Sequence, residues 1–186
     1  MAKSDEKLIL RFRRTGDSKC LDELIHRHTD KIRRVIYSMV LNDDDADELT
    51  QESFLRAFKG LKGFGGRAEF STWLYRIALN TTYSFLERRG RTIPENAEGF
   101  GTVAAPRELE PEEGASFLEL EDWVDRALKR LSPPLRTAIV LHVLHGMKVN
   151  EIADVAGCKP QTVYWRVHEA RRLLNVFLER FLKHDQ

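Results

Sequence analysis

Apolar residues recur at three- and four-residue steps along almost the whole chain of 186 residues. Such spacing gathers them on one face of an α-helix, and no stretch shows the alternation typical of a half-buried strand. The clearest stripe lies between about Ser18 and Leu41 and consists of Leu21, Leu24, Ile25, Ile32, Val35, Ile36 and Met39. The sequence therefore predicts an all-α protein.

One segment interrupts this periodicity. From Gly90 to Ala115 the chain contains three prolines, four glycines and six glutamates, a composition typical of a linker. Helical patterns lie on both sides of it. We therefore expect two small helical domains, residues 1–90 and 116–186, joined by a flexible, acidic linker at 91–115.

Composition narrows the possible cellular settings. No apolar run approaches the roughly 18 residues of a membrane span, and the N-terminus carries charges where a signal peptide would be apolar. The two cysteines, Cys20 and Cys158, are too far apart in sequence to suggest a disulfide framework. These features predict a cytoplasmic protein without membrane insertion. The net charge of +1 is compatible with nucleic-acid binding but does not demonstrate it.

Residues 149–163 have the pattern of a helix-turn-helix. A small residue, Ala153, permits close helix packing, and Gly157 suits the tight turn. In the second helix the spacing predicts a buried stripe of Val163, Val167, Ala170 and Leu174. The opposite face would offer side chains to base edges and cations to phosphates, and it comprises Lys159, Gln161, Thr162, Tyr164, Trp165, Arg166, His168, Arg171 and Arg172. The alternative is a plain helix pair with a solvated polar face.

Two N-terminal patterns also suggest binding surfaces. Asp47, Glu48, Gln51 and Glu52 share one helical face beside Leu55, which suits a basic partner, although a solvated helix start would look similar. The helix from about Phe70 to Arg89, with the Gly-rich loop before it, combines aromatic, basic and amide residues that could hold single-stranded DNA: Phe64, Trp73, Arg76 and Asn80. In the alternative, Trp73 belongs to the core and Arg76 is a surface residue.

Taken together, these motifs resemble the sigma-70 family of bacterial transcription initiation factors, in its extracytoplasmic-function (ECF) type. That type retains only the second and fourth conserved regions. The resemblance rests on three segments in family order, which are DADELTQESFLRAF, FSTWLYRIALN and LSPPLRTAIVLHVLHGMKVNEIADVAGCKPQTVYWRVHEARRLL.

The resemblance implies a role for each matching position. Core RNA polymerase would be held through its β′ coiled coil by Asp47, Glu48, Gln51, Glu52, Phe54 and Phe58. An unpaired base of the −10 element would meet Phe64, Arg76 and Asn80, and the helix-turn-helix would read the −35 element and meet the β flap. The resemblance also implies control by an anti-sigma factor.

Three positions depart from the family pattern. Tyr164-Trp165 stands where Arg-Ser is common, Glu169 where a basic residue is frequent, and Lys148 where serine usually caps the preceding helix. The −35 sequence read by this chain therefore does not follow from the family.

Two other functions are compatible with parts of the sequence. A stand-alone helix-turn-helix regulator would bind duplex DNA unaided, usually as a symmetric dimer, but no dimerisation heptad is apparent. A zinc enzyme could use His142, His145 and Cys158, yet a fourth ligand at a suitable spacing is not evident. We expect no enzyme activity, no catalytic residues, no metal and no cofactor.

Overall fold

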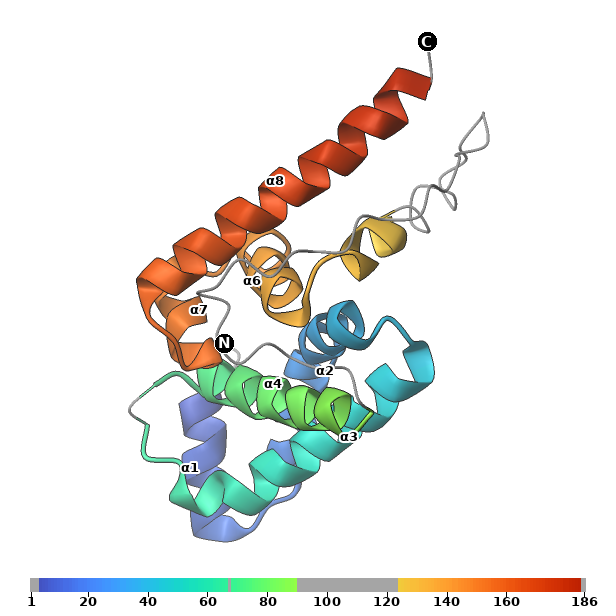
Figure 1. Cartoon of the computed structure of the whole chain (residues 1–186). Helices are drawn as coiled ribbons and strands as arrows, with labels where there is room; N and C mark the ends of the chain where they lie inside the picture. The colour runs from blue at the N-terminus through green and yellow to red at the C-terminus, as the bar shows by residue number, and fades with distance from the viewer. Residues whose placement is uncertain (1–3, 67, 90–123, 185–186) are drawn as a thin grey trace. The chain divides into compact units, whose positions relative to one another are not determined.

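The computed structural model describes residues 4–66, 68–89 and 124–184, and their secondary structure is helical (Figure 1). The all-α prediction is confirmed for these residues. The chain divides into two compact units, one of residues 1–91 with 154–157 and the other of residues 92–153 with 158–186, and each unit is described by itself. The linker predicted at 91–115 lies outside the described residues.

The first unit is a bundle built around a long central helix. It contains α1 (Asp5–Thr15), α2 (Lys19–Val40), α3 (Asp43–Gly60), the short 3-10 helix η1 (Leu61–Gly63) and α4 (Phe70–Arg88). Helix α2 contacts α1, α3 and α4, and α3 also contacts α4. The core is formed by fully buried apolar side chains from α2, α3 and α4, among them Leu24, Ile32, Ile36, Leu49 and Leu74.

The helix ends in this unit follow from local residues. Gly16 closes α1 with a φ of 69°, a left-handed conformation that glycine adopts without strain. Helix α3 begins after Asn42, whose side-chain oxygen accepts the Asp45 amide at 2.9 Å. Helix α1 begins directly after Ser4, whose side chain makes no capping hydrogen bond.

The C-terminal part of the chain contains helical residues 124–129, followed by α6 (Pro133–Val143), α7 (Val149–Ala156) and α8 (Pro160–His184), and all of it except 154–157 belongs to the second unit. Buried Arg136 donates to the carbonyls of Leu128 at 2.7 Å and Leu131 at 2.9 Å. These bonds satisfy acceptors at a helix end and fix the chain ahead of α6.

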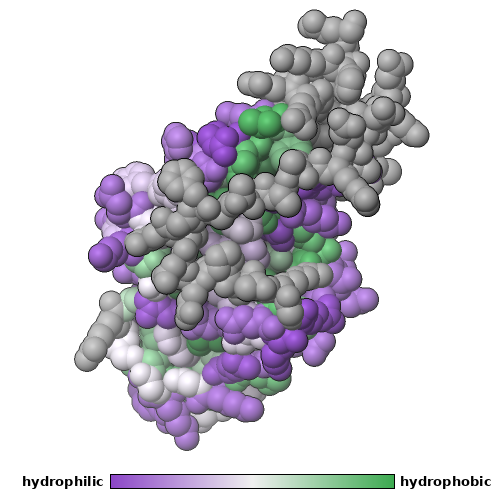
Figure 2. Space-filling view, viewed as in Figure 1, coloured by the Kyte–Doolittle hydropathy of each residue, from purple (hydrophilic) through white to green (hydrophobic). Residues whose placement is uncertain are grey.

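Hydrophilic residues cover much of the coloured surface in Figure 2, with smaller hydrophobic patches between them. Within the described ranges, no helix combines the length and the apolar character that crossing a bilayer requires.

Candidate nucleic-acid and polymerase interfaces

Helices α7 and α8 form the predicted helix-turn-helix. Gly157 adopts a φ of 65° in the turn, and the Cys158 amide donates to the Ala153 carbonyl at 3.1 Å. Ile152 and Ala153 are buried on α7, as is Val163 on α8. The short connection and the small residue at the contact hold the two helices close together, which leaves the opposite face of α8 exposed.

The exposed face of α8 carries the residues expected to read DNA. Gln161 and His168 are exposed, and two large aromatic side chains remain 63% (Tyr164) and 45% (Trp165) exposed. The stripe on the other side is buried at Val163, Val167 and Ala170 and half-buried at Leu174. Because exposed aromatics of this size usually meet a partner, this face is a strong candidate for a binding surface.

An open groove of about 560 Å³ lies beside this face and is lined by residues of the second unit, namely His142, Lys148, Val149, Asn150, Tyr164, Val167, His168 and Arg171. Sequence reasoning assigned Tyr164, His168 and Arg171 to DNA but did not include Lys148 or Asn150. Lys148 and Asn150 lie at the start of the first helix of the motif, and this position could have marked them as candidate DNA contacts. A cation and an amide at that point suit a phosphate oxygen.

The start of α7 also explains one departure from the family pattern. Lys148 has no side-chain acceptor that could cap the helix. Its own backbone amide instead donates to the Glu151 carboxylate at 2.7 Å. This is half of a capping box, so the helix start is stabilised without the usual serine.

The predicted phosphate contacts differ in how available they are. Lys159 and Arg171 are exposed. Arg172 is bound to Glu169 at 2.7 Å, and this hydrogen bond lowers the pKa of the Glu169 carboxyl. Arg166 is half-buried and directs one guanidinium nitrogen to the Cys158 sulfur at 3.7 Å. Arg166 therefore supports the turn of the motif as well as carrying a charge.

On the first unit, α3 presents the predicted polymerase-binding face. Asp47, Glu48 and Gln51 are exposed, and Leu55 is 60% exposed. The four lie at helical spacing on neighbouring turns, with Leu55 four residues after Gln51. An exposed leucine among acidic and amide groups fits a partner surface that is both basic and apolar.

Ion pairs modify the charge of this α3 face. Arg33 from α2 binds Asp43 at 2.6 Å and Asp47 at 2.5 Å, and the bond to Asp47 is the main cause of a raised Arg33 pKa. Glu52 is half-buried and paired with Arg56 at 2.5 Å. Glu48 forms no ion pair within the described part of the chain, which leaves its carboxylate available.

The two predicted phenylalanines of α3 lie deeper than its polar face. Phe54 is only 5% exposed and Phe58 is half-buried, and their ring centroids are 5.9 Å apart. In the free chain they pack within the first unit. The structure therefore places Phe54 beneath the surface of α3 rather than on it.

The residues expected to hold a −10 base are in two different settings. Phe64 is 8% exposed, and its ring lies 5.1 Å from that of Trp73 and 6.0 Å from that of Phe70. Trp73 is half-buried in this cluster, so it is neither a fully buried core residue nor freely exposed. Arg76 and Asn80 are exposed on α4, one turn apart. Phe64 therefore packs inside the aromatic cluster, whereas the Asn80 side chain is exposed to solvent.

The residues considered for zinc do not form a ligand set. The His142 Nδ1 atom lies 3.0 Å from the Met147 carbonyl. No group of three or more potential ligands was found among the residues that the structure describes.

Comparison with known proteins matches both units. The family model "Sigma-70 region 2" matches residues 24–92, and "Sigma-70, region 4" matches residues 121–174. RNA polymerase sigma-H factor of Pseudomonas aeruginosa is 34% identical over 186 residues, covering 96% of each protein. ECF RNA polymerase sigma-E factor of Haemophilus influenzae is 33% identical, covering 92% of this chain and 93% of that factor.

Two solved structures have a similar fold. The sigma factor RpoE in complex with the anti-sigma factor NepR from Bartonella quintana is 26% identical with a TM-score of 0.66, covering 85% of this chain and 96% of RpoE. CnrH in complex with the cytosolic domain of CnrY is 25% identical with a TM-score of 0.71, covering 96% of this chain and 99% of CnrH. The chain therefore belongs to the sigma-70 family of RNA polymerase sigma factors, in its ECF type.

Proposed function

We propose that this sigma factor binds core polymerase and promoter DNA through three separate surfaces. Helix α3 binds the β′ coiled coil of core RNA polymerase, the first unit captures an unpaired base of the −10 element, and α8 reads the −35 duplex. The observation that carries this proposal is the exposure of the polar face of α3 and the aromatic face of α8, each within a segment that matches a sigma-70 region.

On α8, base reading is assigned to Gln161, Thr162, Tyr164, Trp165 and His168. A helix in the major groove offers its N-terminal side chains to base edges, and aromatic rings can contact the methyl group of thymine. Phosphates are assigned to the cations that flank this face, which are Lys159, Arg166, Arg171 and Arg172. The groove adds Lys148 to these cations. The same unit would contact the β flap.

On α3, Glu48, Gln51 and Leu55 make direct contact with polymerase. The proposed role of Phe54 and Phe58 is to support the helix from below, since both are packed within the unit. Asp47 and Glu52 contribute negative charge that Arg33 and Arg56 partly neutralise. A surface with one exposed apolar residue and few unpaired charges suits a large protein partner.

For the −10 element, Asn80 donates to and accepts from the base, and Arg76 neutralises a neighbouring phosphate. Phe64 lies within the aromatic cluster and forms the floor of the site. Its ring would become available to the base only if the loop after it shifts in the polymerase complex.

The same assignment covers the domains of the chain, its location in the cell and its control. Residues 1–90 and 116–186 act as separate binding domains, joined by a linker at 91–115. The chain acts as a binding subunit in the cytoplasm, without catalytic residues, metal or cofactor. An anti-sigma factor controls it, and the complex of RpoE with NepR supports this for a related fold.

In vitro transcription with core polymerase over a randomised promoter library tests the division of labour. Asn80→Ala is expected to change the −10 preference alone, and Trp165→Ala the −35 preference alone, because the two residues lie in different units. If either variant changed both preferences or neither, that residue would lose its assigned role. The alternative, a stand-alone regulator, predicts duplex binding by the purified chain without core enzyme.

A further inference from the structure

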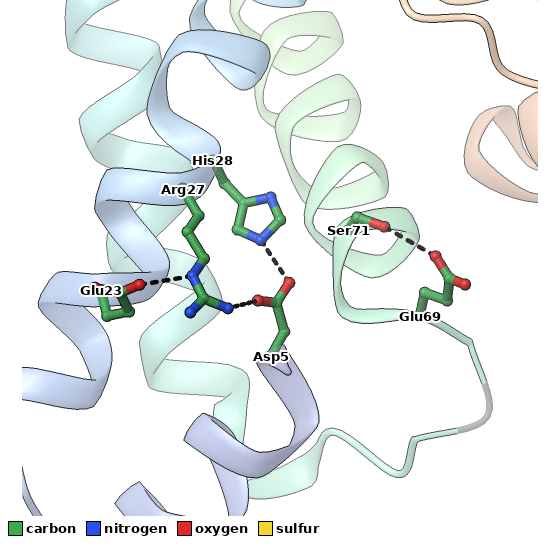
Figure 3. A network of polar contacts seen from close by, with 6 residues as sticks. All are labelled: Asp5, Glu23, Arg27, His28, Glu69 and Ser71. Carbon is green, nitrogen blue, oxygen red and sulfur yellow. Dashed lines mark hydrogen bonds and ion pairs between the residues drawn. The ribbon is translucent and has the colours of Figure 1, made fainter. Parts of the chain in front are cut away.

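Helix α1 precedes the part of the chain that matches sigma-70 region 2, which begins at residue 24. It is nevertheless fixed at both ends. At its start, the Asp5 carboxylate binds His28 Nε2 at 2.6 Å and Arg27 Nη1 at 3.0 Å (Figure 3). Both partners lie on α2, and Arg27 is also held by Glu23 at 2.8 Å. Asp5 thus fixes the start of α1 against α2.

At the other end of α1, Arg13 reaches a segment that is 48 to 51 residues away in sequence. Its Nε donates to the Leu61 carbonyl at 3.1 Å, and its Nη2 donates to the carbonyls of both Leu61 and Phe64. Leu61 is the first residue of η1, and Phe64 directly follows η1. One guanidinium therefore holds the backbone at the end of α3 and at Phe64 together.

This arrangement is chemically favourable. Carbonyl oxygens at a helix end carry partial negative charge, and each has two lone pairs, so the Leu61 carbonyl accepts from the guanidinium as well as from the Phe64 amide at 3.2 Å. Arg is suited to two acceptors at once because its donors form a rigid planar fork. A lysine in the same place would keep the charge but lose the fixed geometry.

Both ends of α1 lead to the same aromatic cluster. Phe64, whose carbonyl Arg13 holds, packs against Trp73 and Phe70. His28, which Asp5 holds, places its ring edge-on to Phe70 with centroids 5.4 Å apart. Phe70 is the first residue of α4, the helix that carries Asn80.

The cluster leaves little room for adjustment. A Cβ atom added to Gly60 would lie 3.3 Å from the Trp73 ring, so the end of α3 is already in close contact with α4. A shift of the backbone at Leu61 or Phe64 would therefore move the Phe64 ring against its neighbours. The Arg13 bonds restrain the backbone on which the Phe64 ring is carried.

We propose that Arg13 is a positioning residue for the capture of the −10 base. It does not touch DNA; it fixes the backbone that carries Phe64 and so sets the floor of the site. This inference rests on the −10 role proposed above for Phe64 and Asn80. It assigns a function in promoter selection to a helix outside the matched region.

The test uses the full chain bound to core polymerase and a fork DNA with a single-stranded −10 element. The readout is the ratio of affinities for this DNA and for the same DNA with a scrambled −10 element. We expect Arg13→Ala to lower the ratio about tenfold, the size of effect that loss of hydrogen bonds to a charged group produces. Arg13→Lys should recover part of it. The matched control is Arg14→Ala, an exposed arginine in the same last turn of α1 that should leave the ratio unchanged.

Each outcome bears on a separate claim. If the wild-type complex does not discriminate between the two DNAs, the proposed −10 role itself fails. If wild type discriminates and Arg13→Ala does so equally well, the positioning role is refuted. A loss of core binding in Arg13→Ala as large as the loss of −10 binding would also refute it, because Arg13 would then only support the fold of the whole unit.

Discussion

The exposed leucine of α3 gives a direct test of the polymerase-binding face. Leu55 is 60% exposed in the free chain, so replacing it with alanine should hardly affect folding. If this side chain becomes buried against polymerase, the loss in binding can be estimated. Full burial of a leucine side chain contributes about 1.5–3 kcal/mol, and the exposed part of Leu55 accounts for about 1–2 kcal/mol of that.

A difference of about 1–2 kcal/mol corresponds to a factor of roughly 5–30 in the dissociation constant. We therefore expect Leu55→Ala to weaken binding to core polymerase by that factor. The chain contains a matched control, because Leu10 on α1 is the same residue type, in the same unit, and is 63% exposed. Leu10→Ala should leave the affinity within about twofold, since α1 lies outside the proposed interface and changes at such surface sites are small.

Fluorescence anisotropy of the labelled chain titrated with core enzyme measures both variants, and circular dichroism checks that each remains folded. The reasoning is refuted if Leu55→Ala binds as tightly as wild type, or if Leu10→Ala loses as much affinity as Leu55→Ala. The second result would mean that apolar surface in general, rather than the α3 face, determines binding.

Two further predictions concern helix α3 and helix α8. Asn42→Ala removes the cap of α3 and should cost about 1 kcal/mol, lowering the unfolding temperature of a unit of this size by about 4–8 °C, whereas Asn42→Ser should restore most of it. An unchanged unfolding temperature in Asn42→Ala would show that the cap is not needed. Glu169→Gln should free Arg172 for a phosphate, tightening binding of the holoenzyme to a −35 duplex and steepening its salt dependence by about one counterion. Because Arg172 lowers the pKa of Glu169, the native pair contributes at neutral pH and is lost as the pH falls through that lowered pKa, so the two proteins should converge at acid pH. A salt slope that the substitution does not alter at neutral pH would argue against a phosphate contact by Arg172.

Features that depend on neighbouring residues could be predicted from the sequence. The turn at Gly157 involves residues a few positions apart, so composition and spacing were sufficient. The buried stripe of α8 follows from helical periodicity for the same reason. The exposed position of Tyr164 and Trp165 is its direct consequence, since they lie on the opposite face.

Features that depend on residues distant in sequence could not be predicted. The bonds from Arg13 to Leu61 and Phe64 exist only once α1 and α3 are packed on α2. The burial of Phe64 likewise requires the contact between α3 and α4 that brings Trp73 beside it. Arg166 was expected at a phosphate, but its place against Cys158 depends on the three-dimensional path of the turn. Residue type alone does not show which arginine side chains already interact with other residues of the chain.

The central claim is that the two units recognise promoter DNA together and only when core polymerase holds them. The most direct measurement is a binding assay on one duplex promoter with the chain alone, core enzyme alone and both, repeated with five extra base pairs between the −35 and −10 elements. We expect tight, specific binding only when both proteins are present, and a large loss with the lengthened spacer, because half a helical turn moves one element to the other side of the duplex. Equally tight binding by the chain alone, or binding that ignores the spacer, would contradict the account.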